Sequence, residues 1–148
     1  MPPQLAFDIS NVDLTKVAFD MDVVRQYNPQ RGDMEHLNGF VYLNYDHGIG
    51  FKDVRENEFW VPGHLPGRPL LPGVIMIEAA AQASSFVTKK GMNWEGFIGF
   101  GGVDKVKFRQ QVTPGQRILL PQQDDLDAPQ AHLLHRAGPG RRQRDLRR

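Results

Sequence analysis

The sequence of 148 residues contains no cysteine. This absence excludes a disulfide scaffold, a thiol nucleophile and a thiolate metal site. No apolar run approaches the roughly 20 residues of a membrane-spanning helix. The N-terminus also lacks the basic and apolar regions of a secretory signal, so we expect a cytoplasmic protein with no membrane partner. The 18 Lys and Arg nearly balance the 17 Asp and Glu, and such a balance gives no support for a nucleic-acid partner.

Strand-forming residue types are missing from the last part of the chain. From Leu119 to Arg148 there is no Val, Ile, Thr, Phe, Tyr or Trp, and six arginines lie between Arg136 and Arg148. Such a composition disfavours β-strands. We therefore expect residues 1–120 to form one domain. Residues 121–148 are expected to be a disordered basic tail, which either binds an anionic partner or is a non-native end.

The remaining sequence predicts a mixed α+β domain. Apolar residues at helical spacing after Asp13 predict a helix through Gln26. A longer central helix is predicted over residues 74–88, which contain no Pro or Gly and are apolar on nearly all sides, as in a buried helix. Aromatic and β-branched residues predict several strands, of which the first two form a hairpin: 40–45, 49–55, 97–100, 103–112 and a strand beginning at 117.

One acidic residue stands out in the central helix. Glu78 is the only ionisable side chain between Arg68 and Lys89. A carboxyl group in an apolar setting must find a partner or keep its proton. Gln82 lies one turn further along and could donate a hydrogen bond to Glu78 or to a ligand. A purely structural Glu78, bonded to the backbone or to Arg68, explains the pattern equally well.

The loop before this helix is rich in proline. Four of the 11 prolines lie between Pro62 and Pro72. Because proline fixes its own φ and restrains the preceding residue, we expect a stiff, extended loop that leads into the helix. His64 stands near its start. A lone histidine is more often an ordinary surface or core residue, but an imidazole held rigidly before a buried glutamate suits acid–base chemistry.

The run from His64 to Gln82, HLPGRPLLPGVIMIEAAAQ, closely resembles the signature of the FabZ-type 3-hydroxyacyl-[acyl-carrier-protein] dehydratases. Three further motifs follow the family's order: NEFW at 57–60, GVDKVKFR at 102–109 and VTPG at 112–115. The resemblance covers roughly residues 40–120. It implies a hotdog fold, in which an antiparallel β-sheet wraps around a long central α-helix.

The same resemblance implies a reaction in fatty acid biosynthesis. Family members remove water from a (3R)-hydroxyacyl chain on the phosphopantetheine arm of an acyl carrier protein and form a trans-2-enoyl thioester. They use no metal and no organic cofactor. They are homodimers or trimers of dimers, and the two residues that act together come from different subunits.

In family terms, His64 and Glu78 are the expected catalytic residues. His64 would remove the proton at carbon 2. Glu78, kept protonated by its apolar surroundings, would protonate the departing hydroxyl. The N–H groups of Gly73 and Val74 at the helix N-terminus would bind the thioester oxygen. With Gln82, these two residues form the expected substrate-binding set.

Two departures from the family pattern affect these expectations. Residues 29–34 read PQRGDM where the family has a Pro-His-Arg-Tyr-Pro-Phe-like stretch. The family also continues beyond the position of Leu120 with about two more long strands, which are missing or altered here. Part of the helix would then lose its cover. An acyl thioesterase on the same fold and an inactive acyl-binding or structural subunit therefore stay open as alternatives.

Overall fold

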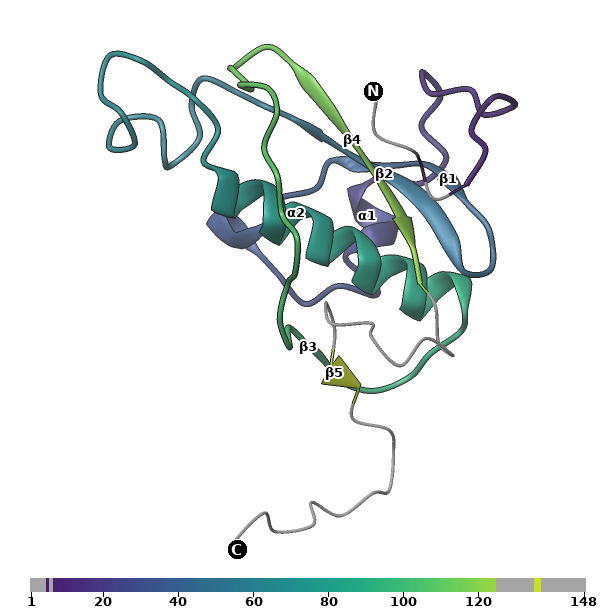
Figure 1. Cartoon of the computed structure of the whole chain (residues 1–148). Helices are drawn as coiled ribbons and strands as arrows, with labels where there is room; N and C mark the ends of the chain where they lie inside the picture. The colour runs from purple at the N-terminus through teal and green to yellow at the C-terminus, as the bar shows by residue number, and fades with distance from the viewer. Residues whose placement is uncertain (1–4, 6, 125–134, 137–148) are drawn as a thin grey trace, which may run out of the picture.

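The computed structural model describes residues 5, 7–124 and 135–136. One long helix, α2 (Gly73–Phe86), lies against an antiparallel sheet (Figure 1). The sheet contains β1 (Gly39–Leu43), β2 (His47–Asp53) and β4 (Arg117–Gln123) in the order β1-β2-β4. This is the predicted hotdog arrangement. The smaller elements are α1 (Met21–Val24), the 3-10 turn η1 (Gly32–Met34), the π-helical turn η2 (Val87–Gly91), β3 (Ile98–Gly99) and β5 (His135–Arg136).

The predicted hairpin is confirmed and carries much of the core. Strands β1 and β2 pair antiparallel, with Phe40 opposite Gly50 and an irregularity between Phe40 and Tyr42. The ring centroids of Phe40 and Phe86 lie 4.3 Å apart, and both side chains are fully buried. A Cβ atom at Gly50 would lie 3.2 Å from that of Ala83. Glycine at this position therefore lets the helix approach the sheet closely.

The helix predicted from Asp13 is wrong. The Asp13 side chain instead accepts hydrogen bonds from the N–H and the hydroxyl of Thr15, as in a local turn. The short helix α1 begins later, and its N-cap is Asp20, which accepts a hydrogen bond from Val23 N. A cap residue is thus present in both places, but only the second is followed by a helix.

The expected strand over residues 103–112 is also wrong, because the described chain has no strand there. Residues 103–111 lie mostly on the surface, and only Val112 pairs through its backbone with the loop before α2, where Leu71 N donates to its carbonyl over 2.8 Å. Isolated residues of strand-forming type do not make a strand without a neighbour to pair with.

The expected end of strand formation at Leu120 is wrong, because strands occur in the predicted tail. β5 (His135–Arg136) pairs antiparallel with β3. Strand β4 continues to Gln123, and Pro121 pairs with Ile49 of β2. β4 is an edge strand of the described sheet, where proline is tolerated because one side needs no ladder hydrogen bond. Most of the predicted tail, 125–134 and 137–148, lies outside the described residues.

Burial of α2 differs between its two halves. The second half is buried, whereas Val74 in the first turn is 71% exposed and residues 75–78 are only partly buried. The prediction of a helix buried on all sides is therefore wrong for its N-terminal half in the single chain, since the three strands cover only one side. None of the described helices is long and apolar enough to span a bilayer.

Candidate active site

Residues 61–68 of the proline-rich loop form turns and bends, so the extended conformation expected from its prolines is wrong there. Residues 69–72 carry no turn, and Pro72 has φ −59° and ψ 135°. His64 N donates to the carbonyl of Trp60 over 2.8 Å, and Arg68 N donates to that of Leu65 over 2.9 Å. Leu65 and Gly67 adopt positive φ values of 56° and 79°. Proline's fixed φ also suits turn positions, so the same residues stiffen a compact loop.

His64 projects from this loop with an exposed side chain. The next residue, Leu65, holds a left-handed backbone conformation that is unfavourable for a residue with a Cβ atom. Such strain is concentrated at functional sites. No hydrogen bond or ion pair joins the side chains of His64 and Glu78 within the described residues.

The N-terminus of α2 has free donors and an aromatic neighbour. Pro72 is the N-cap residue, and its carbonyl accepts hydrogen bonds from Ile75 N and Met76 N over 3.0 and 3.2 Å. The N–H groups of Gly73 and Val74 precede these first helical bonds. The ring of Phe108 lies against Gly73, where a Cβ atom would be 2.7 Å from it. Substrate contact at Gly73 and Val74 stays a prediction.

Glu78 is held by the residue one turn along the helix. Gln82 Nε2 donates to Glu78 Oε1 over 2.8 Å, so the hydrogen bond foreseen between them is present. The Glu78 side chain is half-buried, and the full burial expected for it is wrong in the single chain. No hydrogen bond from Arg68 or from the backbone reaches Glu78 in the described chain, so the structural partners considered for it are not used.

Gln82 connects Glu78 to the segment before β1. It is 3% exposed. Its Nε2 also donates to the Met34 carbonyl over 2.7 Å, and its Oε1 accepts from His36 N over 3.0 Å. Its backbone carbonyl accepts from Asn28 Nδ2 over 2.8 Å. Both ends of the side-chain amide are therefore committed, which fixes its orientation and the position of Glu78 Oε1.

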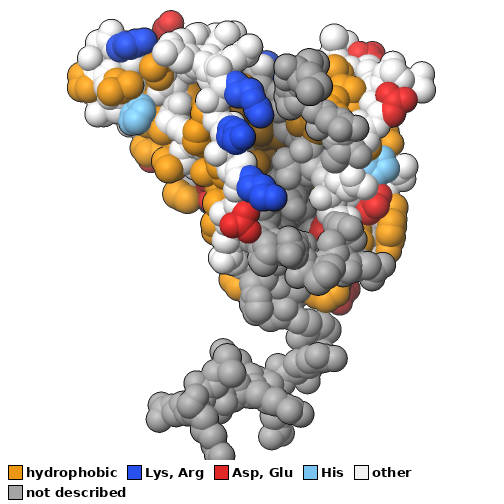
Figure 2. All heavy atoms as spheres, viewed as in Figure 1, with side chains coloured by type: hydrophobic (Ala, Val, Ile, Leu, Met, Phe, Trp, Pro, Cys, Tyr) orange, Lys and Arg blue, Asp and Glu red, His pale blue; other side chains and the backbone are white. Residues whose placement is uncertain are grey.

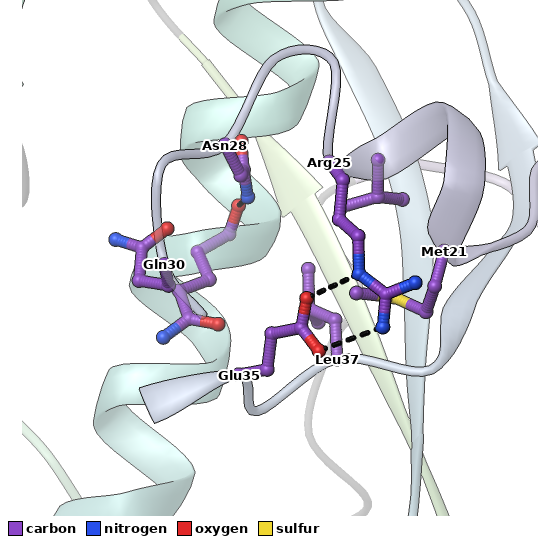
Figure 3. A pocket seen from close by; sticks show the side chains of 8 residues that line it. Met21, Arg25, Asn28, Gln30, Glu35 and Leu37 are labelled. Atoms are coloured by element: carbon purple, nitrogen blue, oxygen red, sulfur yellow. Dashed lines mark hydrogen bonds and ion pairs between the residues drawn. The ribbon is translucent and has the colours of Figure 1, made fainter. Parts of the chain in front are cut away.

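An ion pair fixes the same segment from the other side. Arg25 Nε and its terminal nitrogen donate to the two carboxylate oxygens of Glu35 over 2.6 and 2.9 Å (Figure 3). Hydrogen bonding from Arg25 lowers the pKa of Glu35. The pair borders a small pocket lined by eight residues: Met21, Val24, Arg25, Asn28, Gln30, Glu35, Leu37 and Gln82. Glu35 thus anchors the residues that contact Gln82.

A buried charged pair near the site was not foreseen. Lys52 Nζ lies 2.9 Å from Glu58 Oε2, and the side chain of Lys52 is 3% exposed. The same oxygen accepts from Trp60 Nε1 over 2.8 Å, while Oε1 accepts from Arg55 N over 2.9 Å. Burial acts to raise the pKa of Glu58, but these three donors together outweigh it and lower that pKa. One feature of the sequence indicates such a pair: Lys52 lies within a mostly apolar strand, where a buried lysine needs an acidic partner.

His36 is the second residue that the sequence did not reveal. It is 2% exposed, and its ring centroid lies 6.1 Å from that of Phe59. Burial lowers the pKa of His36, and the positive charge of Lys52 lowers it further. The negative charges of Glu78, Glu58 and Asp33 act in the opposite direction. Burial and the charge of Lys52 therefore favour the neutral form of His36, which lies among charged groups of both signs.

Comparison with known proteins gives a family for this arrangement. The model of the FabA-like domain matches residues 28–123. The chain belongs to the FabA-like family. This match includes every residue predicted for the site, from His64 through Gly73, Val74 and Glu78 to Gln82.

Curated relatives of this FabA-like chain carry the name 3-hydroxyacyl-[acyl-carrier-protein] dehydratase FabZ. The relative from Natranaerobius thermophilus is 40% identical over 103 residues, which are 68% of this chain and 72% of the relative. That from Alkaliphilus metalliredigens is 45% identical over 74 residues, 49% of this chain and 50% of the relative. The relative from Syntrophomonas wolfei is 37% identical over 76 residues, which are 51% of this chain and 53% of the relative. The matched region thus spans only about half the length of the last two relatives.

Proposed function

We propose that this chain catalyses the dehydration of a (3R)-hydroxyacyl thioester to the trans-2-enoyl thioester in fatty acid biosynthesis. The observation that carries the proposal is Glu78, fixed by Gln82 on the helix whose N-terminus follows the His64 loop. A match to relatives named for this reaction supports it. In this proposal, His64 is the base and Glu78 is the acid that act on one substrate.

In the proposed mechanism, the imidazole of His64 takes the proton from carbon 2. The electron pair of that C–H bond forms the double bond between carbons 2 and 3. The C–O bond at carbon 3 breaks, and a protonated Glu78 gives its proton to the leaving hydroxyl, which departs as water. The N–H groups of Gly73 and Val74 stabilise negative charge that develops on the thioester oxygen.

The direct test measures the reverse reaction, hydration, with a short thioester. The purified protein is mixed with a crotonyl thioester, and hydration is measured as the loss of enoyl absorbance. His64→Ala and Glu78→Ala are each expected to lower turnover about 100-fold to 10,000-fold, as for loss of an acid or base. Full activity in both variants contradicts these roles. Release of free thiol without hydration would instead show an acyl thioesterase.

We also propose that the site is completed by a second copy of this chain. Four large apolar side chains around the N-terminal half of α2 and the following segment are more than half exposed: Val74, Phe97, Phe100 and Phe108. Exposed apolar patches of this kind mark protein interfaces. A homodimer, or a trimer of dimers, would cover them. Light scattering coupled to gel filtration tests this, and a monomer at all concentrations contradicts it.

An acyl carrier protein is the proposed carrier of the substrate. Its phosphopantetheine arm contains an anionic phosphodiester. Lys105, Lys107 and Arg109 are exposed at alternate positions of the segment that crosses in front of α2. Lys and Arg side chains form a row on this face (Figure 2). Charge reversal of the three should raise KM for carrier-linked substrate and leave that for a small thioester unchanged. An equal effect on both substrates contradicts the assignment.

The cytoplasm, where an acyl carrier protein would be met, is the proposed location. Fractionation of source cells, with an antibody against this chain, tests that placement.

A further inference from the structure

A buried carboxylate that the proposed mechanism does not use lies shortly before His64 in the sequence. Glu58 is 8% exposed, and its ion pair with Lys52 joins it to β2. A buried ion pair is weak evidence for stability, because apolar side chains of similar volume often serve equally well. Charged groups do supply direction, since each carboxylate oxygen holds a donor in a defined place. The groups bonded to Glu58 therefore indicate its role.

Glu58 fixes the indole of Trp60. Its Oε2 accepts from Trp60 Nε1 over 2.8 Å, and its Oε1 accepts from Arg55 N over 2.9 Å. Trp60 is 4% exposed and belongs to one buried apolar cluster with Val54 and Leu71. Side chains from the first turn of α2 pack against the same cluster. The carboxylate and these apolar contacts together hold the indole in one orientation.

The backbone of Trp60 in turn holds His64. The carbonyl of Trp60 accepts from His64 N over 2.8 Å and from Gly63 N over 3.3 Å. The imidazole of His64 is exposed, so its position depends mainly on the backbone that carries it. A continuous set of bonds thus runs from β2 through Glu58 and Trp60 to His64.

We propose that Glu58 is a positioning residue for His64 and acts on it through Trp60. This inference rests on the proposed function, in which His64 takes the proton from carbon 2. Glu58 moves no proton and does not touch the substrate. A base must meet the C–H bond at a defined distance and angle, and a displacement of about 1 Å can lower the rate about 100-fold. Loss of the bond between Glu58 and Trp60 should therefore lower kcat and change KM little.

Trp60→Phe tests this bond, because phenylalanine keeps an aromatic ring but has no N–H to donate. In hydration of a crotonyl thioester, kcat should fall about 10-fold to 100-fold, while KM stays within about twofold. Ile49→Val is the matched control. It removes a buried methylene group from a separate cluster of the sheet, so it should lower the melting temperature but keep kcat. A Trp60→Phe protein with parental kcat overturns the role of Glu58.

Glu58→Asp is a second variant that tests the same bond from its other end. It keeps the negative charge beside Lys52 but withdraws the carboxylate by one methylene group, away from Trp60 Nε1. It should lower kcat as Trp60→Phe does. The two changes together should lower kcat no further than either alone, because both remove one interaction. Fully multiplied losses in the double variant contradict a shared cause.

A His64→Ala background separates a role through His64 from general damage to the fold. If Glu58 acts through His64, adding Trp60→Phe should change the residual turnover of the His64→Ala protein by less than about twofold, since residues that act as a unit are not additive. A further 10-fold loss in this background, about as large as in the parent, contradicts the inference.

The parent protein keeps this inference distinct from the proposed function. If the parent hydrates the thioester and His64→Ala lowers its turnover, while Trp60→Phe and Glu58→Asp keep the parental kcat, only the role of Glu58 fails. If the parent shows no hydration, or if His64→Ala leaves hydration unchanged, the proposed function or its base fails, and the role of Glu58 fails with it.

Discussion

The amide of Gln82 donates to Glu78 Oε1 across 2.8 Å, one helical turn along α2. The same amide bonds the backbone of Met34 and of His36. A catalytic acid needs a fixed orientation, because a displacement of about 1 Å can reduce the rate 100-fold. The position of Glu78 thus depends on a segment more than 40 residues away in sequence, which the Arg25–Glu35 pair holds in turn.

Replacing Gln82 by leucine should reduce both stability and turnover. The change leaves the buried His36 N–H and the partly buried Met34 carbonyl without their partner, so the free energy of unfolding should fall by about 1–3 kcal/mol. Urea unfolding measures this. Turnover should fall through kcat more than KM, since Glu78 loses its orientation. A variant with parental kcat would show that Gln82 does not position the acid.

The free energy of unfolding should decline as the pH falls below 6.5, the ordinary pKa of histidine. The pKa of His36 is lowered from its usual 6.5 in the folded chain. Below about pH 6.5 the unfolded chain therefore binds a proton that the folded chain refuses, and the free energy of unfolding falls. At pH values more than about one unit above 6.5, both states are neutral and this contribution is constant.

Urea unfolding of the parent and of His36→Leu at pH 5.5 and 7.0 isolates the contribution of His36. The parent should lose more stability than the variant over this interval. The lowered pKa values of Glu35 and Glu58 affect stability at lower pH. Their contribution to the free energy of unfolding is lost as the pH falls below about 4.5. Parallel pH profiles for the two proteins would contradict a neutral buried His36.

Removing one partner of the buried ion pair should be severe. Lys52→Met leaves Glu58 buried without its cation, and loss of one partner typically costs about 3–5 kcal/mol. Lys52→Met combined with Glu58→Gln should recover part of that loss, because the uncompensated charge is removed, while the single amide oxygen accepts from only one of Trp60 Nε1 and Arg55 N. Thermal unfolding of the three proteins measures the pattern. A double variant as unstable as the single one would contradict an electrostatic cause.

A glycine substitution tests the packing of the chain after α2. A Cβ atom at Gly91 would lie 2.5 Å from the carbonyl oxygen of Tyr45 and 2.9 Å from that of Asn44. Both obstacles are backbone, so Gly91→Ala should destabilise the fold by about 2 kcal/mol. Gly63→Ala meets no atom within 4 Å and serves as the control, with a change within about 0.5 kcal/mol. Equal melting temperatures would contradict the described contact.

The sequence predicts the parts of this fold that depend on local patterns. The hairpin and α2 follow from residue types along each segment, and the Gln82–Glu78 bond follows from helical spacing. The turns of the proline-rich loop were missed because proline suits both extended and turn conformations. β4 continued past Leu120 because pairing with β2 outweighs the poor strand propensity of Pro121, Gln122 and Gln123.

The site was predictable only where one segment contains it. His36, Lys52 and Glu58 come from three separate segments, and no spacing rule connects residues that meet only after folding. Burial of Glu78 was overestimated for a related reason. The apolar composition of residues 74–77 indicates that these side chains are covered, but not whether the cover comes from the same chain.

The most direct test of the account mixes two inactive proteins. If His64 of one subunit works with Glu78 of its partner, a dimer of one His64→Ala chain and one Glu78→Ala chain retains one intact site. Random reassembly of equal amounts should then restore about a quarter of parental crotonyl-thioester hydration, since half the dimers are mixed and each has one of two sites. Mixed dimers that form but stay inactive would contradict a site shared between subunits.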